Sequence, residues 1–184
     1  MSSDNKKIYR QDNHIYFYDD VTDESIAEFI VLLRDANIFV ATKLATLGIK
    51  SLPIHLHINS GGGDVFSGLA ATSHIENSDA DVYTYIEGQC ASAATLMSLS
   101  GAKRFITARS FMLIHEVSYY FDNSHRHSDL KDEVSNSDAI MKVIMDFYEE
   151  KSELKKKTLK KILKKDLYFS AGECLKLHLV DQIN

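Results

Sequence analysis

Two strand–turn–helix units, each with a turn built from very small residues, constrain the fold of this chain most strongly. Apolar residues alternate with histidines over residues 54–58, which predicts a strand, and three consecutive glycines follow within the turn 59–63. A second strand is predicted over 82–86, and a helix of small residues over 91–100 follows it. Because strands that alternate with helices pair in parallel through right-handed crossovers, the sequence predicts an α/β fold with mainly parallel strands.

The rest of the chain continues this pattern without a visible boundary between domains. Thr22 is a suitable N-cap for a helix that continues to Gly48, where glycine predicts its end. The chain has one proline and no Gly/Ser-rich linker, so we expect a single domain over residues 1–184, in which 1–13 form a short polar N-terminal segment. The remaining predicted elements are strands over 14–18, 105–107 and 111–114, a helix over about 129–148 and a lysine-rich helix over about 153–165.

Charge and composition exclude several classes of function. The formal net charge is -5, so the chain lacks the overall basic character of a nucleic-acid-binding protein. No apolar stretch approaches the length of a membrane span, and the N-terminal segment lacks the apolar core of a signal peptide. The two cysteines, Cys90 and Cys174, are far apart and do not suggest a disulfide framework. We therefore expect a cytoplasmic protein without a nucleic-acid or membrane partner.

Ser92 is the first candidate for chemistry, because it begins a predicted helix and has alanines on both sides. Small neighbours let the chain turn sharply and present the hydroxyl at the edge of the sheet, as a nucleophile turn requires. The backbone N–H groups of Gly63 and Ala93 would then form an oxyanion hole with two donors. Glycine-rich turns also serve as packing devices or phosphate cradles, so this motif alone does not decide the function.

His115 and Asp166 are the candidate partners of Ser92. His115 ends the apolar strand predicted over 111–114, at the strand edge where α/β folds place ligands, and would act there as a general base. Asp166 follows the lysine-rich helix, and its carboxylate would hold the histidine tautomer. Taken alone, His115 is better explained as a structural histidine at the end of a strand, and the spacing does not exclude that Asp166 is part of a solvated helix end.

Taken in order, four segments resemble the proteolytic subunits of the Clp protease family. His-Ile-Asn-Ser-Gly-Gly-Gly (57–63) is similar to the family's Asn-Ser-Pro-Gly-Gly turn, with Gly61 in place of proline. Gly-Gln-Cys-Ala-Ser-Ala-Ala (88–94) and Arg-Ser-Phe-Met-Leu-Ile-His (109–115) resemble its serine and histidine motifs. Asp-Leu-Tyr-Phe-Ser-Ala (166–171) resembles its final segment, which carries the catalytic aspartate. The resemblance covers most of the chain from His14 onward.

This resemblance implies a ClpP/crotonase-like fold with a projecting handle over about 116–150, and a serine endopeptidase that needs no metal or organic cofactor. It implies stacked heptameric rings, a tetradecamer of this chain, that degrade unfolded polypeptides delivered by an AAA+ unfoldase. The implied site residues are Ser92 as nucleophile, His115 as base, Asp166 as orienting acid, Gly63 and Ala93 as oxyanion hole, and Gly62, Tyr119 and Tyr120 as substrate-binding residues.

The chain also departs from the family pattern, which leaves two rival functions. Its segment before the first strand is short, and His55 and His57 stand where the family often has aromatic residues in the unfoldase docking cleft. Residues 119–121 replace the family's glycine-rich handle strand. These departures suggest a divergent, virus-encoded or accessory member. The rivals are a phage head-maturation or signal-peptide-peptidase-like protease that acts without an unfoldase, and an inactive or regulatory ring subunit.

Three further features have simpler explanations than a second site. His55 and His57 share one strand face, and His125 and His127 form a similar pair, but no further ligand residue stands at matching spacing, so we expect no metal site. Cys90 is better explained as a buried residue beneath the serine turn than as a nucleophile. Eight lysines over 151–165 fit a solvated helix face better than a patch that binds polyanions.

Overall fold

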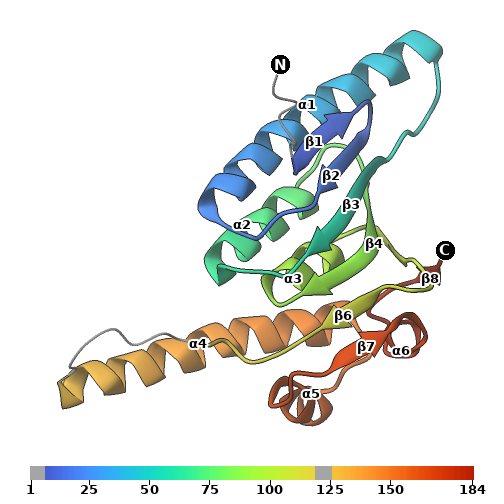
Figure 1. The fold of residues 1–184 in the computed structure, drawn as a ribbon. Helices are drawn as coiled ribbons and strands as arrows, with labels where there is room; N and C mark the ends of the chain where they lie inside the picture. The colour runs from blue at the N-terminus through green and yellow to red at the C-terminus, as the bar shows by residue number, and fades with distance from the viewer. Residues whose placement is uncertain (1–6, 119–125) are drawn as a thin grey trace, which may run out of the picture.

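The computed structural model describes residues 7–118 and 126–184, which form a mixed sheet and the helices around it (Figure 1). The strands run in the order β1-β2-β3-β4-β5-β8, and β6 joins β4 to β7 beside this row. The strands are β1 (Ile8–Gln11), β2 (His14–Phe17), β3 (Ile54–Ser60), β4 (Val82–Ala91), β5 (Lys103–Ile106), β6 (Phe111–Leu113), β7 (Tyr168–Ser170) and β8 (Gln182–Ile183). The helices are α1 (Asp23–Leu47), α2 (Val65–Glu76), α3 (Ala93–Leu99), α4 (His127–Lys151), α5 (Lys156–Leu163) and α6 (Ala171–Lys176).

Strand pairing confirms the predicted α/β class. β2, β3, β4 and β5 pair in parallel, whereas β1 and β7 pair antiparallel with β2 and β6. β4 is ten residues long, and its first half pairs with β5 while its second half pairs with β6. The sheet therefore divides along β4, and β6 leaves the main row beside the end of β4 that leads into α3.

Local sequence explains where the first helix begins and ends. The hydroxyl of Thr22 accepts a hydrogen bond from the Ser25 N–H at 3.1 Å, and the Thr22 N–H donates to the Ser25 hydroxyl at 2.9 Å, which forms a capping box. Gly48 ends the helix in the left-handed conformation, with φ 64°, as its position in the sequence predicts. Both predicted ends of α1 are thus confirmed.

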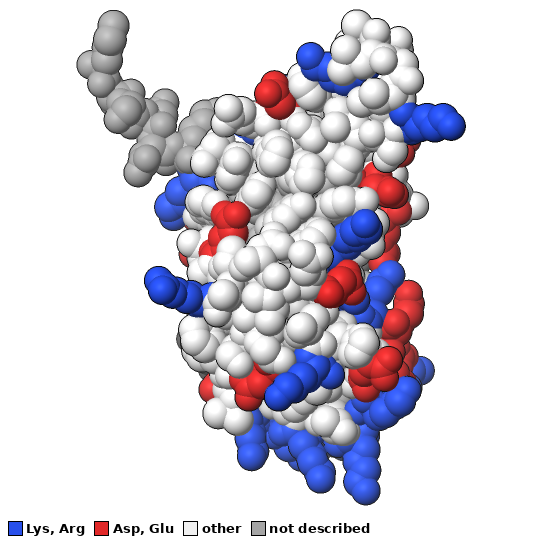
Figure 2. All heavy atoms as spheres, turned by 90° about the vertical axis from the view of Figure 1, so that its right-hand side faces the viewer, with Lys and Arg blue, Asp and Glu red and all other residues white. Residues whose placement is uncertain are grey.

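Among the residues that the structure describes, helices cover one face of the sheet and leave the opposite face partly open. Ile54, Leu56 and Ile58 on β3 are fully buried beneath α1 and α3, whereas His55 and His57 on the opposite face are only partly buried. This alternation is the pattern from which the strand was predicted. The view in Figure 2 shows a surface whose middle is largely uncharged, with basic side chains gathered at its lower end.

Helix α4 projects from the body of the molecule (Figure 1). Ile144 and Tyr148 near its C-terminal end are buried, whereas Leu130 and Val134 near its N-terminal end are exposed. The lysine-rich helix α5 is shorter than predicted: Leu154 is buried, and its N–H donates to the Ser152 hydroxyl at 3.2 Å, so the chain turns before the helix begins. No helix in the described ranges is long and apolar enough to cross a membrane.

Candidate active site

Ser92 stands at the junction of β4 and α3 in a strained backbone conformation. Its φ is 53° and its ψ is -127°, a combination that side-chain-bearing residues rarely adopt. Such strain costs on the order of 1–3 kcal/mol and persists only where the surroundings hold it. The Ser92 N–H donates to the Leu113 carbonyl at 2.9 Å, and the Ser92 carbonyl accepts from the Thr95 N–H at 3.0 Å. The turn is therefore held from both sides, as in a nucleophile turn.

The glycine-rich turn after β3 lies directly against the Ser92 turn. A Cβ atom on Gly62, whose φ is 90°, would lie 2.6 Å from the Ser92 Cβ and 2.5 Å from the Ala91 carbonyl oxygen. A Cβ atom on Gly63, whose φ is 147°, would lie 2.2 Å from the Val21 carbonyl oxygen. Only glycine at these two positions permits both the backbone conformation and the close approach.

Two backbone N–H groups beside Ser92 have no acceptor within the part of the chain that the structure describes. They belong to Gly63 and Ala93, and both residues line the same cavity as Ser92. By contrast, the Gly62 carbonyl accepts from the Val21 N–H at 2.8 Å. Free N–H groups of this kind stabilise an oxyanion that forms next to them. The structure therefore brings together the two donors that the sequence suggested.

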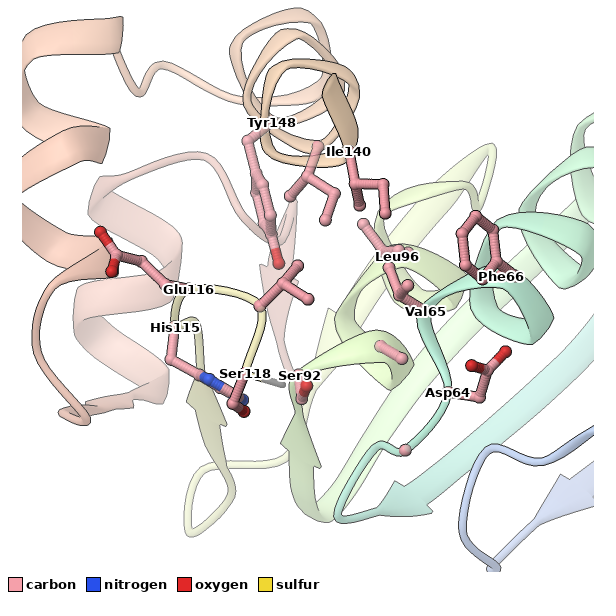
Figure 3. Close-up of a pocket in the computed structure, with 14 residues that line it drawn as sticks. Asp64, Val65, Phe66, Ser92, Leu96, His115, Glu116, Ser118, Ile140 and Tyr148 are labelled. Atoms are coloured by element: carbon pink, nitrogen blue, oxygen red, sulfur yellow. The ribbon is translucent and has the colours of Figure 1, made fainter. Parts of the chain in front are cut away.

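The cavity itself has a volume of about 300 Å³ and is lined largely by apolar side chains (Figure 3). Phe66 at its rim is 62% exposed, whereas Leu96 is buried. Its lining residues are Gly63, Asp64, Val65, Phe66, Ser92, Ala93, Leu96, His115, Glu116, Val117, Ser118, Ile140, Ile144 and Tyr148. A pocket of this kind suits an apolar group of a ligand next to the Ser92 hydroxyl.

His115 lines the same cavity, because β6 leads directly to it. β6 pairs in parallel with the end of β4, with Leu113 opposite Ala91, so the residues after β6 lie next to the Ser92 turn. Figure 3 shows the imidazole of His115 extending from the loop toward Ser92. Among the described residues, no hydrogen bond connects the two side chains.

Asp166 lies outside the cavity lining and is exposed. The antiparallel pairing of β6 and β7 ends with Leu113 opposite Tyr168, two residues before His115 and two residues after Asp166. The described part of the chain contains no hydrogen bond between them. The structure thus places His115 at the cavity and Asp166 just beyond the pairing of β6 and β7, outside the cavity lining.

The other predicted site residues have different outcomes. Gly62 is part of the turn that contacts Ser92, although it is not among the residues that line the cavity. Tyr119 and Tyr120 lie outside the described residues. The sequence interpretation missed Thr95 and Tyr148, whose hydroxyls contact each other beside Ser92. A polar Thr95 within a helix of small apolar residues was the one signal that pointed to this contact.

Cys90 and the histidines of β3 lie among packing and hydrogen-bond contacts of the sheet. Cys90 is fully buried, and burial raises the pKa of its thiol, so the side chain remains protonated and packs beneath the turn. His57 donates or accepts a hydrogen bond with His14 at 3.0 Å and contacts Glu87 at 2.8 Å. No group of metal-ligating side chains that could hold an ion is found in the described ranges.

The structure therefore defines an α/β protein in which a strained serine turn and a histidine line the same cavity. The model of the Clp protease family matches residues 7–184, so the chain belongs to the Clp protease family. It is 30% identical over 173 residues to the ATP-dependent Clp protease proteolytic subunit 1 of Chlamydia muridarum, covering 92% of this chain and 84% of that protein.

Two further relatives carry the name ATP-dependent Clp protease proteolytic subunit. The protein of Deinococcus radiodurans is 26% identical over 168 residues, which covers 83% of this chain and 81% of the relative. The protein of Streptococcus mutans is 32% identical over 135 residues, which covers 71% of this chain and 67% of the relative. The similarity therefore spans most of the chain, including the strands and turns that form the cavity.

Proposed function

We propose that this chain is a serine endopeptidase that cleaves unfolded polypeptides or peptides through an acyl-enzyme formed on Ser92. The observation that carries this proposal is the strained Ser92 turn, which opens into a cavity that His115 also lines. Membership of the Clp protease family supports the same reaction class. Strained backbone at a cavity is a mark of functional sites, because a purely structural turn gains nothing from it.

In the proposed mechanism, the Ser92 hydroxyl attacks the peptide carbonyl while His115 takes its proton and later returns that proton to the leaving amine. The free N–H groups of Gly63 and Ala93 hold the oxyanion of the tetrahedral intermediate. In the active arrangement that we propose, the Asp166 carboxylate orients His115. Water then attacks the acyl-enzyme while His115 takes its proton, and that proton returns to the Ser92 oxygen as the carboxylic acid product leaves. This chemistry uses only side chains and backbone groups of the chain.

The assembly that we propose follows from the relatives, which are proteolytic subunits of an ATP-dependent protease. One domain over residues 1–184, with the handle 116–150, would build stacked heptameric rings that enclose the cavity and receive polypeptide from an AAA+ unfoldase. Exposed apolar side chains along α1 and α4 provide surface for such contacts; among them are Val31, Ile38, Val134 and Val143.

The test is the intact mass of the protein after incubation with a fluorophosphonate, which reacts only with an activated serine. The assembled fraction from size-exclusion chromatography is used, and Ser92→Ala is the matched control. A single adduct on the wild type that is absent from Ser92→Ala supports the proposal. No adduct on an assembled ring would contradict it and favour a regulatory subunit instead.

A second variant tests the role of the carboxylate. Asp166→Asn is expected to lower the rate of adduct formation by roughly a hundredfold to ten-thousandfold, because His115 loses its orienting charge. Asp132→Asn, at an exposed position on α4, removes an equal charge away from the cavity and is expected to react like the wild type. Equal rates for the two variants would remove Asp166 from the mechanism.

A further inference from the structure

Tyr148 connects the projecting helix α4 to the Ser92 turn. Its side chain is 2% exposed, and its hydroxyl contacts the hydroxyl of Thr95 on α3, which is fully buried. Figure 3 shows Tyr148 extending from α4 toward the cavity that Ser92 lines. Thr95 in turn lies 2.5 Å from the Ser92 carbonyl oxygen, measured from its Oγ1 atom. Two hydroxyls therefore form a continuous path from α4 to the backbone of Ser92.

The direction of these hydrogen bonds follows from counting protons. A carbonyl oxygen can only accept, so the single proton of the Thr95 hydroxyl is donated to the Ser92 carbonyl. Tyr148 must then donate its own proton to the Thr95 Oγ1 atom. Burial raises the pKa of Tyr148, so its hydroxyl keeps that proton. Each donation polarises the next hydroxyl, which strengthens the bond to Ser92.

The Ser92 carbonyl shares a peptide plane with the Ala93 N–H. In a planar trans peptide the C=O and the N–H point in opposite directions, so a group that fixes one also fixes the other. The Ser92 carbonyl accepts from both the N–H and the hydroxyl of Thr95, at 3.0 Å and 2.5 Å. These two bonds set the direction of the Ala93 N–H, which has no acceptor within the described residues and lines the cavity.

We propose that Thr95 and Tyr148 are positioning residues, which hold the Ser92–Ala93 peptide so that the Ala93 N–H is aimed at the oxyanion. This inference rests on the proposed peptidase function. It assigns no contact with substrate to the Thr95 hydroxyl. The two hydroxyls act through the Ser92–Ala93 peptide plane, and a tilt of that plane turns the Ala93 N–H away from the oxyanion.

The experiment compares two substitutions at one position. Thr95→Val keeps the size of the side chain and removes the hydroxyl, whereas Thr95→Ser keeps the hydroxyl and removes the methyl group. We measure the maximal rate of fluorophosphonate inactivation and the concentration for half-maximal rate. Thr95→Val is expected to lower the maximal rate by about tenfold without changing the half-maximal concentration, because only the transition state uses the donor. Thr95→Ser is expected to retain the rate.

Tyr148→Phe tests the second hydroxyl, and Tyr18→Phe is its matched control. Tyr18 donates to Glu87 outside the cavity, so its variant loses a phenol hydrogen bond without touching the Ser92 turn. Tyr148→Phe is expected to slow inactivation several-fold, and the Thr95→Val/Tyr148→Phe double variant to be no slower than Thr95→Val alone. That non-additivity would show that both hydroxyls act on one peptide.

Three results would overturn the inference. Thr95→Val and Tyr148→Phe could react at the wild-type rate while their urea midpoints fall, which would show a purely structural role. Thr95→Ser could be as slow as Thr95→Val, which would assign the effect to packing. Finally, no adduct on the assembled wild type would reject the proposed function and the inference together. This outcome is distinguished from the other two because it is seen in the wild type itself, whereas they require a reactive wild type and concern only the variants.

Discussion

Replacing Gly62 by alanine tests the contact between the two turns that form the candidate site. The new Cβ atom would lie 2.5 Å from the Ala91 carbonyl oxygen and 2.6 Å from the Ser92 Cβ, both far inside van der Waals contact. The backbone at φ 90° adds strain of about 1–2 kcal/mol for a residue with a side chain. Relief of the clash by backbone movement costs a further 1–3 kcal/mol or so, as in overpacked cores. Gly62→Ala should therefore destabilise the protein by roughly 3 kcal/mol.

Substitutions at two other glycines separate the cost of backbone strain from the cost of the steric clash. Gly48 has φ 64° and open space around its Cβ position, so Gly48→Ala is expected to cost only the strain, about 1 kcal/mol. The Cβ of Gly61→Ala would meet its nearest atoms at 3.8 Å, and this change should be nearly neutral. The free energy of unfolding is measured by urea titration at one fixed protein concentration, since any self-association adds to apparent stability.

The result that would refute this reasoning is a Gly62→Ala variant no less stable than Gly48→Ala. Equal costs would mean that the two turns are not in contact and that backbone strain alone accounts for the glycine. If the clash is real, the Ser92 turn must move to accommodate the methyl group. Gly62→Ala should therefore also slow fluorophosphonate inactivation in the folded, assembled fraction, whereas Gly61→Ala should not.

The remaining predictions concern pH and the Ser92 backbone. Burial lowers the pKa of His55 from 6.5 to about 4, so the unfolded chain binds a proton that the folded chain does not, and stability should fall as the pH decreases from about 6.5 toward 4. After allowance for solvent screening the loss is roughly 1–2 kcal/mol, and urea titrations at several pH values should show a weaker pH dependence for His55→Gln. Ser92→Gly should be about 1 kcal/mol more stable than Ser92→Ala, because glycine adopts φ 53° without strain, and neither variant should form the adduct.

Sequence predicted the parts of the fold that depend on local signals. The alternation over 54–58, the small residues around Ser92 and the glycine at 48 each act within a few residues, so the structure places these elements close to where they were predicted. The predicted boundary between β4 and α3 was less accurate. β4 continues to Ala91 because its second half pairs with β6, and that pairing depends on a strand further along the chain.

Residues of the candidate site were predictable from the sequence only where they lie within one short motif. Ser92, Gly63 and Ala93 lie within such motifs, and the cavity includes all three. The position of Asp166 relative to His115 depends on the pairing of β6 and β7, which no local pattern specifies. The contact between Thr95 and Tyr148 spans 53 residues of sequence, and Tyr148 fits the apolar seam of α4 equally well without it.

The strain at Ser92 connects these observations. An unfavourable backbone conformation of on the order of 1–3 kcal/mol persists only if several contacts oppose its relaxation. Here the Ser92 N–H donates to the Leu113 carbonyl, and Thr95 donates to the Ser92 carbonyl. Gly62 packs against the Ser92 side chain and restricts its movement. Each restraint comes from a segment that also contributes to the cavity: β6 leads to His115, α3 begins with Ala93, and the 59–63 turn ends in Gly63. The contacts that keep the serine strained therefore come from the same segments that bring His115, Gly63 and Ala93 to the cavity, so relaxing the turn would also disassemble the candidate site.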